Sequence, residues 1–492
     1  MDKKKAVIIG AGIGGLATAS YLAGNGYDVE IFEKNSAPGG RCGRLVRDGY
    51  RFDLGATMLM MPEVYKEVFG SLGIPLFENG DIQPLDDLYR IYFDNNQVLD
   101  FSPDKAKMKD QLEKIEKGSY ARSEEYVSKG YEIFRLGMGK LIGRNFYSFF
   151  EFARPGNIGL LIKLKTYINH WSYAKKFFSD KHLLMAYTFQ NIYVGQSPFS
   201  SPALFSMVPA AELTEGSFFP RGGMHSIVEK LLDKALSNGV KVHYGKPVKK
   251  IIINNKLAQG IILEDNSEVK ADIIVANADL PYVYRKLLPD ERLSRRIGRM
   301  KYSCSSICFH WGLDKSYPQL AHHNVFLSDG FKEGLDRIFT DKTVSDTPSF
   351  YVHAPCRTDS SAAPAGHESL SFIVAAGHVD AEKKQDWDKM KRTTREYLVK
   401  RLKQAGLEDI DEHIVFEASY TPVSWENACN ITRGSVFGSL AHNIFQMGWF
   451  RPHNQHPRYK NLYFTGGSTH PGNGIPNVLL SAKLTSERIL KN

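Results

Sequence analysis

The first 33 residues contain the pattern that restricts the fold of this chain most strongly. The glycines Gly10, Gly12 and Gly15 form the spacing GxGxxG directly after the short apolar run KAVII, and a helix-like segment rich in small residues follows them. A second apolar run, DVEIF, leads into Glu33, 23 residues after Gly10. This order of strand, glycine turn, helix, strand and acid predicts a βαβ unit that binds a dinucleotide.

Each residue of the pattern has a physical role in such a unit. Gly10 permits a tight turn, Gly12 lets the backbone approach a pyrophosphate, and Gly15 lets the helix pack closely on the strand. The helix N-terminus offers free N–H groups and a partial positive charge to the phosphates. Glu33 would accept hydrogen bonds from a ribose hydroxyl.

The residues after Glu33 favour a flavin over a nicotinamide cofactor. The turn PGGR at residues 38–41 and the stretch GYRFDLGATML at residues 49–59 resemble the flavoprotein branch that also contains amine oxidases. The resemblance implies FAD, with the Gly-Gly-Arg turn following the ribose-binding acid and the later glycine loop beside the flavin ring.

Later segments return the chain to the same domain. The glycine turn FFPRGGM at residues 218–224 precedes a helical pattern that ends at Asn238 and Gly239, and VKVHYG follows as a strand. Residues 249–279 are predicted to form three strands joined by Asn-Asn and Asp-Asn turns. Near the end of the chain, NLYFTG predicts the last strand of the sheet, and a glycine-rich break leads to a helix that begins near Asn477.

We therefore expect both chain ends to hold one FAD. The last strand would deliver Gly466 and Gly467 to the pyrophosphate, and the final helix would point its N-terminus at the pyrimidine end of the flavin, where negative charge gathers on reduction. The residues predicted to bind FAD are Gly10, Gly12, Gly14, Gly15, Glu33, Lys34, Gly40, Arg41, Gly55, Ala56, Thr57, Met58, Val248, Asn277, Gly467, Gly474, Ile475 and Pro476.

These segments predict an α/β fold with a Rossmann-like FAD-binding domain of the flavin amine oxidase or glutathione reductase type. Strand-like runs between residues 300 and 450 predict a substrate domain built on a mixed sheet, and the region before the second glycine turn is predicted to be a helical, membrane-associated insertion. The boundaries are 1–70, 216–295 and 455–492 for the FAD-binding domain, 71–105 and 296–454 for the substrate domain, and 106–215 for the insertion.

The insertion carries many aromatic side chains interleaved with lysines, most clearly in IGLLIKLKTYINHWSYAKKFF. That alternation is typical of a helix lying in a membrane interface, and a core helix with solvated lysines is the alternative. The aromatic residues are Phe146, Tyr147, Phe149, Phe150, Phe152, Tyr167, Trp171, Tyr173, Phe177 and Phe178.

The net charge and the cysteines limit which partners and which cellular compartment are expected. The net charge of +9 fits an anionic membrane surface, and no nucleic-acid motif accompanies it, so no nucleic acid is predicted. The five cysteines are scattered, which favours a reducing compartment without disulfides or a metal site, and Cys304 and Cys308 are predicted to be buried thiols. With no stretch of ~18 apolar residues, we expect a cytoplasmic protein attached peripherally to the inner face of the cell membrane.

From end to end, the chain resembles the bacterial-type carotenoid desaturases, the phytoene desaturase family. The resemblance implies FAD as the sole redox cofactor and a long apolar tunnel for a C40 carotenoid. It also implies that C=C bonds form by hydride transfer to flavin with proton loss from the adjacent carbon, and that electrons pass to quinone or oxygen. The segments that carry it are GAGIGGLA, PGGR, GYRFDLGAT, SFFPRGGM, ANADLPYVYRKLL, HAPCRTDSSAAPAG, GWFRPHN and NLYFTGGSTHPGNGIPNVLLSAK.

The resemblance also implies two catalytic candidates. The family has an acid and an arginine three residues apart in the aromatic insertion, and SFFEFAR supplies Glu151 and Arg154 at that place. Glu151 would take the proton, and Arg154 would keep the carboxylate of Glu151 ionised or bind a quinone. The alternative is a surface ion pair between residues i and i+3. For His470 we expect a structural role in holding the glycine loop.

Two departures from the family pattern concern the substrate. FDLGAT stands where relatives commonly have FDAGPT, and Asn473 and Asn477 replace the alanine and the last glycine of HPGAGIPG. They argue against phytoene itself and leave open a later-pathway enzyme, such as a 3,4-desaturase of hydroxylated or monocyclic carotenoids. The alternatives on the same scaffold are a carotenoid cis–trans isomerase, an amine-oxidase-like flavoenzyme and a non-catalytic isoprenoid-binding escort protein.

Overall fold

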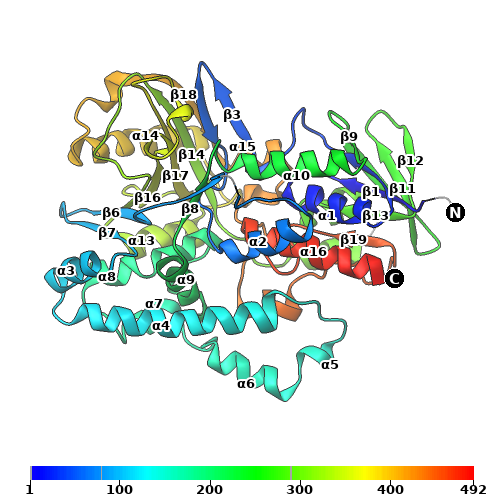
Figure 1. The fold of residues 1–492 in the computed structure, drawn as a ribbon, viewed down its shortest axis with the longest axis horizontal. Helices are drawn as coiled ribbons and strands as arrows, with labels where there is room; N and C mark the ends of the chain where they lie inside the picture. The colour runs from blue at the N-terminus through cyan, green and yellow to red at the C-terminus, as the bar shows by residue number, and fades with distance from the viewer. Residues whose placement is uncertain (1–2, 79, 289–290, 492) are drawn as a thin grey trace.

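A computed structural model describes residues 3–78, 80–288 and 291–491. Its central element is a five-stranded, wholly parallel sheet in the order β19-β13-β1-β2-β9. Figure 1 shows the two termini on the same side of the molecule, beside this sheet. The strands are β1 (Lys5–Ile9), β2 (Asp28–Phe32), β9 (Lys241–His243), β13 (Ile273–Ala276) and β19 (Leu462–Phe464).

Both faces of the parallel sheet are covered, which explains why its inner strands β1 and β13 are almost wholly apolar. Ala6 and Ile8 of β1 pack against helices, and Val7 and Ile9 pack against a second, antiparallel sheet, because side chains alternate along a strand. The helices are α1 (Ile13–Gly24), α2 (Pro62–Ser71), α10 (His225–Ser237) and α16 (Ile475–Lys491). The antiparallel sheet comprises β10 (Val248–Asn254), β11 (Leu257–Leu263) and β12 (Glu268–Lys270).

The prediction of three strands within residues 249–279 was wrong, because the segment forms four. The first three make the antiparallel sheet, and β13 leaves it to join the parallel sheet beside β1. Asp272 marks the change of sheet, since its carboxylate accepts a hydrogen bond from the backbone N–H of Lys5 at 2.7 Å. The predicted final strand and helix are confirmed as β19 and α16, and α16 begins at Ile475, two residues before Asn477.

The predicted mixed sheet is confirmed. It has seven strands in the order β18-β14-β17-β16-β15-β6-β7, and only its β15–β6 pair is parallel. The long polar helix α14 (Trp387–Gln404) covers one face. The strands are β6 (Tyr89–Phe93), β7 (Val98–Phe101), β14 (Ser305–Leu313), β15 (His323–Leu327), β16 (Phe350–His353), β17 (Glu368–Ala376) and β18 (Ile414–Tyr420).

Helices pack against the other face of this sheet and extend along the lower edge of the molecule in Figure 1. Residues 106–215 are helical, as predicted: α3 (Lys105–Ile115), α4 (Ser119–Gly137), α5 (Phe149–Phe152), α6 (Pro155–Lys163), α7 (His170–Ala174), α8 (Lys181–Ala186) and α9 (Met207–Glu215). The remaining strands and α-helices are β3 (Arg44–Arg47), β4 (Tyr50–Asp53), β5 (Ile82–Pro84), β8 (Phe218–Pro220), α11 (Leu280–Tyr282), α12 (Glu291–Gly298), α13 (Phe331–Asp336) and α15 (Pro422–Cys429).

The aromatic-rich stretch is not one interfacial helix. It is divided between α6 and α7, and Lys165 between them has a left-handed φ of 51°, which ends the first helix. Half of the ten aromatic side chains are buried in the core, namely Phe146, Phe152, Tyr173, Phe177 and Phe178. Among the described residues, no helix is both long and apolar enough to cross a membrane.

Asp53, the last residue of β4 and part of the FDLGAT motif, connects the end of β4 to the start of α10. Its carboxylate accepts hydrogen bonds from the backbone N–H groups of Met224 at 2.9 Å and His225 at 3.1 Å. A Cβ on Gly223 would lie 2.7 Å from Asp53 Oδ2, so the turn needs glycine at that position. Burial raises the pKa of Asp53 to about 6, although the two N–H groups oppose the shift.

Candidate functional site

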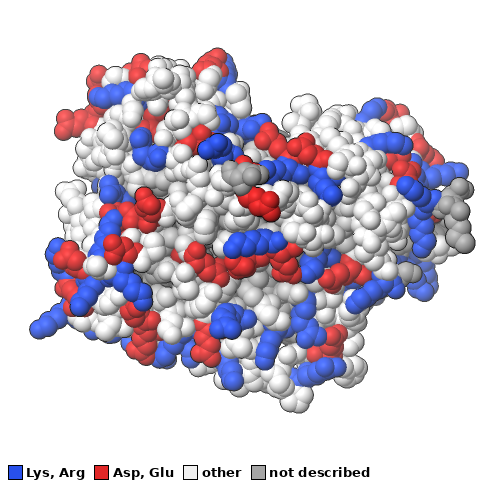
Figure 2. All heavy atoms as spheres, viewed as in Figure 1, with Lys and Arg blue, Asp and Glu red and all other residues white. Residues whose placement is uncertain are grey.

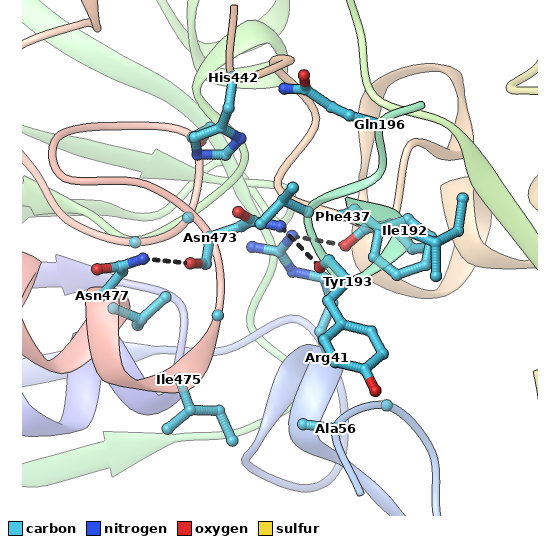
Figure 3. Close-up of a pocket in the computed structure, with 18 of the residues that line it drawn as sticks. Arg41, Ala56, Ile192, Tyr193, Gln196, Phe437, His442, Asn473, Ile475 and Asn477 are labelled. Atoms are coloured by element: carbon cyan, nitrogen blue, oxygen red, sulfur yellow. Dashed lines mark hydrogen bonds between the residues drawn. The ribbon is translucent and has the colours of Figure 1, made fainter. Parts of the chain in front are cut away.

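A cavity of about 650 Å³ extends from the parallel sheet to the mixed sheet, and both ends of the chain line it. Every residue predicted to bind FAD borders the cavity except Gly15. Figure 3 shows Arg41 and Ala56 from the N-terminal part and Asn473, Ile475 and Asn477 from the C-terminal part around one space.

The glycine turn after β1 leaves no room for side chains. A Cβ on Gly12 would lie 2.9 Å from Asn277 Nδ2, and one on Gly14 would lie 2.6 Å from Asn277 Oδ1. Gly12 caps α1 without a side-chain hydrogen bond, so the first N–H groups of the helix remain available to an anion. Gly15 has the packing role predicted for it, because its Cβ would lie 2.2 Å from the carbonyl oxygen of Gly10.

Glu33 is held in a fixed orientation at the end of β2. Its Oε2 accepts the backbone N–H of Ala11 and its Oε1 that of Asn35, each at 2.8 Å. The residue is buried and borders the cavity. This position suits a carboxylate that accepts hydrogen bonds from ribose hydroxyls. Beside it, Lys34 donates to the carbonyl oxygen of Asn427 at 2.7 Å.

Two arginines support the glycine loop after β19. Arg41 borders the cavity and donates to the carbonyl oxygen of Val436 at 3.0 Å. Arg451 is fully buried and donates to the carbonyl oxygens of Gly467 at 2.6 Å and Thr469 at 2.9 Å. Burial, with Arg41 as a second cause, lowers the pKa of Arg451 to about 9. Arg41 therefore places positive charge on the cavity side, which suits an anionic pyrophosphate, whereas Arg451 lies outside the cavity lining and holds the loop from within the core.

Orphaned polar atoms surround the start of α16. Asn477 Nδ2 donates to the carbonyl oxygen of Asn473 at 2.8 Å, and Asn473 Nδ2 donates to that of Tyr193 at 3.4 Å, as Figure 3 shows. The Oδ1 atoms of both asparagines and Thr465 Oγ1 are buried without a hydrogen-bond partner in the described part of the chain. Such acceptors fit a ligand that brings its own donors, as the polar edge of an isoalloxazine does. The glycine cradle, Glu33 and these atoms together fit FAD.

The remainder of the cavity has apolar walls. The helical region contributes from α4, from the 3-10 helix η3 (Phe189–Val194) and from α9, and the mixed sheet contributes from β15, β16 and β17. An apolar, water-poor space of this kind suits a hydrocarbon ligand. Representative wall residues are Phe134, Leu141, Phe189, Leu335, Ile338 and Ile373.

The structure does not bring the two predicted catalytic residues to this cavity. Glu151 accepts a hydrogen bond from Arg144 at 2.6 Å and one from the backbone N–H of Tyr147 at 3.0 Å, and neither it nor the exposed Arg154 is part of the lining. The backbone hydrogen bond and Arg144 lower the pKa of Glu151. Their catalytic role stays a prediction that these positions do not favour. His470 does border the cavity and bonds the carbonyl oxygen of Arg144 at 3.0 Å, which fits the structural role expected for it.

Sequence reasoning missed two acids that border the cavity, the half-buried Asp279 and the buried Glu212. Asp279 accepts the backbone N–H of Thr432 at 3.0 Å and the hydroxyl of Ser439, and burial raises its pKa. Asp279 lies in the segment ANADLPYVYRKLL, which carries the family resemblance, but the sequence did not distinguish the acid itself. Glu212 lies on α9, where a lone acid in a helix gives no sequence signal.

Three histidines also converge, although no metal site was predicted. His322, His323 and His353 are buried, and one ring nitrogen from each lies within 4.8 Å of the others, an arrangement that could hold a metal ion. Tyr351 links the group to the cavity, since its hydroxyl contacts His323 Nδ1 at 2.7 Å and Thr57 Oγ1 at 2.8 Å. The cysteine-based reasoning did not consider these residues. For the predicted thiols, Cys304 and Cys308 are confirmed as buried.

Comparison with known proteins places this geometry in context. Residues 13–490 match the family described as "Flavin containing amine oxidoreductase". A zeta-carotene-forming phytoene desaturase of Myxococcus xanthus is 38% identical over 489 residues, covering 99% of this chain and 94% of that protein. A phytoene desaturase of Fusarium fujikuroi is 36% identical, covering 100% and 90%. A 4,4'-diapophytoene desaturase (4,4'-diaponeurosporene-forming) of Staphylococcus haemolyticus is 32% identical, covering 99% and 98%.

Solved structures agree on the fold. Putrescine oxidase bound to putrescine superposes with a TM-score of 0.67 at 14% identity, with both chains covered completely. An oxidoreductase from Methanosarcina mazei superposes with a TM-score of 0.64 at 18% identity, covering 98% of this chain and 100% of that one. At such identities the likeness concerns the arrangement of the two sheets and the helices.

Proposed function

This chain belongs to the flavin-containing amine oxidoreductases and, within them, to the phytoene desaturases, and on that premise we propose that it introduces C=C bonds into a C40 carotenoid with FAD as the oxidant. One observation carries the proposal. A single cavity is lined both by the residues that fit FAD and by apolar residues from the helical region and the mixed sheet. A hydrocarbon in the apolar part would therefore lie next to the cofactor.

The residues of the chain divide the work between cofactor and substrate. Glu33 would hold the ribose, the N-terminus of α1 and the Gly466–Gly467 turn would hold the pyrophosphate, and the N-terminus of α16 would lie by the pyrimidine edge. Bound FAD supplies hydride acceptance from a carbon next to the polyene. The apolar walls exclude water and hold the polyene in one orientation, which is the main contribution that such a reaction needs from a protein.

Substrate choice is part of the proposal. The similar proteins of Myxococcus and Fusarium carry phytoene in their names, which supports phytoene or an early desaturation product as the substrate. A hydroxylated carotenoid is a second candidate, because the unpartnered Oδ1 of Asn473 in the cavity could accept a hydrogen bond from a substrate hydroxyl, with Asn477 and Thr465 left to the flavin edge. Quinone or oxygen is the proposed final electron acceptor.

We propose further that the cavity opens toward a membrane surface. Large apolar side chains are exposed on and beside α5 and α6, and Phe150 is 84% and Tyr167 70% exposed. The nearby loop at 444–450 adds Phe445, which is 76% exposed, and also Phe450, which borders the cavity. Figure 2 shows Lys and Arg side chains, with some Asp and Glu side chains, among uncharged ones over this lower part of the molecule. A peripheral position on the inner face of the cell membrane would let a carotenoid pass directly from lipid into the cavity.

A vesicle experiment tests the membrane contact. Phe150→Ser combined with Phe445→Ser should weaken co-sedimentation with vesicles containing anionic lipid by about tenfold, since each removes an aromatic side chain from the interface. Val46→Ser is the matched control, because Val46 is 61% exposed on β3, away from this surface. Equal binding by the double variant and the control would contradict the proposed contact surface.

The desaturase function is tested by anaerobic mixing of the flavin-loaded protein with phytoene, lycopene or a hydroxylated carotenoid in vesicles. We expect bleaching of the flavin absorbance together with a red shift of the carotenoid spectrum. A spectral change without net flavin reduction would indicate an isomerase, and a purified protein that binds no flavin would indicate an escort protein. Unchanged spectra with every carotenoid, despite bound flavin, would refute the function.

A further inference from the structure

Glu212 is a buried acid on the face of α9 that forms part of the cavity wall. Its neighbours in that wall, Val208 and Ala211, lie four residues and one residue before it on the same helix. Glu212 is 1% exposed, so its carboxyl group is removed from bulk water while the side chain borders the cavity. Glu151, by contrast, does not border the cavity.

The hydrogen bonds of Glu212 satisfy only one of its two oxygens. Tyr89 donates its hydroxyl to Oε2 at 3.0 Å, and Gln190 Nε2 donates to the Tyr89 oxygen at 2.8 Å, which fixes the orientation of that hydroxyl. Within the described residues, Oε1 of Glu212 has no partner, and neither does the hydroxyl of Tyr193, which also borders the cavity. A buried carboxyl oxygen left without a partner costs stability, and such sites are common where a group acts on a ligand.

Among the residues that the structure describes, no neutralising charge faces Glu212. Burial raises its pKa to about 8, against the opposing hydrogen bond from Tyr89. The titratable groups that face it are Tyr89 from β6 and Tyr193 from η3, and burial raises both of their pKa values well above the usual range, so they stay neutral. From α4, Tyr131 donates to Glu215 at 3.1 Å rather than to Glu212. A carboxylate in such surroundings is a stronger base than one paired with an arginine.

We propose that Glu212 accepts the proton that the carotenoid loses during desaturation. One C–H bond of the substrate breaks with its electron pair, and the hydride passes to the oxidised flavin. The C–H bond on the adjacent carbon breaks without its electron pair, and the proton forms an O–H bond with Oε1 of Glu212. The electron pair left behind becomes the second bond of the new C=C unit, so the two electrons removed match those that the flavin takes up. This role rests on the desaturase function proposed above.

Glu212→Gln is the direct test, because glutamine keeps the acceptor for Tyr89 and cannot take a proton. Anaerobic reduction of the bound flavin by carotenoid is followed at pH values from 6 to 10. In the wild type we expect the rate to rise with pH through about 8, since only the carboxylate is active. Glu212→Gln should keep its flavin, lose at least ~100-fold in rate and lose this pH dependence. Glu215→Gln is the matched control on the same helix, with wild-type behaviour expected.

Tyr89→Phe provides a second test that does not remove the acid. The Tyr89 hydrogen bond lowers the pKa of Glu212, so its loss should move the midpoint of the rate profile to higher pH. A Glu212→Gln protein that reduces its flavin at the wild-type rate would overturn the role. If that variant does not fold, an unshifted midpoint in Tyr89→Phe would overturn it. A wild type that fails to reduce its flavin with any carotenoid would instead refute the desaturase function, and the role of Glu212 with it.

Discussion

Replacement of Gly15 by alanine should disturb the contact between α1 and β1. The new Cβ would lie 2.2 Å from the carbonyl oxygen of Gly10, 1.2 Å short of the 3.4 Å at which ordinary contact begins. It would also lie 3.1 Å from Asn277 Nδ2. Because the obstructing atom belongs to the backbone, the helix must move as a whole. Its N-terminus, which faces the proposed pyrophosphate position, moves with it.

The expected loss follows from two opposing effects. Overpacking of a closely packed site costs about 1–3 kcal/mol, and contact with backbone places this case at the upper end. Alanine gains back about 1 kcal/mol in helix propensity, which leaves a net loss of about 2 kcal/mol. If the whole loss falls on the FAD-bound state, the affinity for FAD drops by about 30-fold, because 1.4 kcal/mol corresponds to a factor of ten.

The assay compares thermal release of flavin, followed by its fluorescence, with FAD affinity measured by titration of the flavin-free protein. Gly24→Ala is the control, since Gly24 lies at the end of the same helix and its Cβ would meet Asn238 Nδ2 at 3.6 Å, an ordinary contact. We expect Gly24→Ala to match or slightly exceed the wild type. Equal flavin release and equal affinity in the two variants would show that the contact between α1 and β1 does not limit the site.

Three further outcomes follow from the structure. Glu33→Ala should weaken FAD retention during gel filtration, whereas Glu30→Ala, on the strand β2 that precedes Glu33 and outside the cavity lining, should not; unchanged flavin content in Glu33→Ala would refute the ribose assignment. Folding raises the pKa of Asp53 to about 6, so the folded state binds the proton of this carboxyl group more tightly than the unfolded state does. The contribution of Asp53 to the free energy of unfolding should therefore fall by up to ~3 kcal/mol as the pH rises from 4 to 7. Asp53→Asn should lack that slope in denaturant titrations, and an identical slope in both proteins would contradict the assignment. Asn473→Ala should reduce turnover of a hydroxylated carotenoid more than that of phytoene; equal effects on both substrates would count against a substrate hydroxyl at Asn473.

The cofactor part of the cavity was predictable because its requirements are local. The turn after β1 needs glycine at spaced positions such as Gly12 and Gly15, and Glu33 must follow β2 directly, so both features appear as fixed spacings in the sequence. The C-terminal strand could be assigned for the same reason, since Gly466 and Gly467 follow it after a single residue, Thr465.

The substrate part was not predictable in the same detail, because it depends on contacts between distant segments. The parallel pairing of β6 with β15 joins residues 90–93 to 324–327, and no local pattern specifies it. The three histidines meet only because His323 lies opposite His353 in the pairing of β15 with β16. Aromatic side chains present a related difficulty, since Phe150 is on the surface while Phe152, two residues away, is buried. Composition alone does not separate the two environments.

The position of β19 has a consequence for folding during synthesis on the ribosome. The glycine turn before α1 is made long before the strand β19 that pairs in its sheet and the helix α16 that packs against α1. The nascent N-terminal segment therefore keeps part of its apolar surface exposed until β19 and α16 have been translated. Association of the two ends over so long a separation in sequence is expected to be a slow step, and supply of the cofactor at that moment would favour its completion.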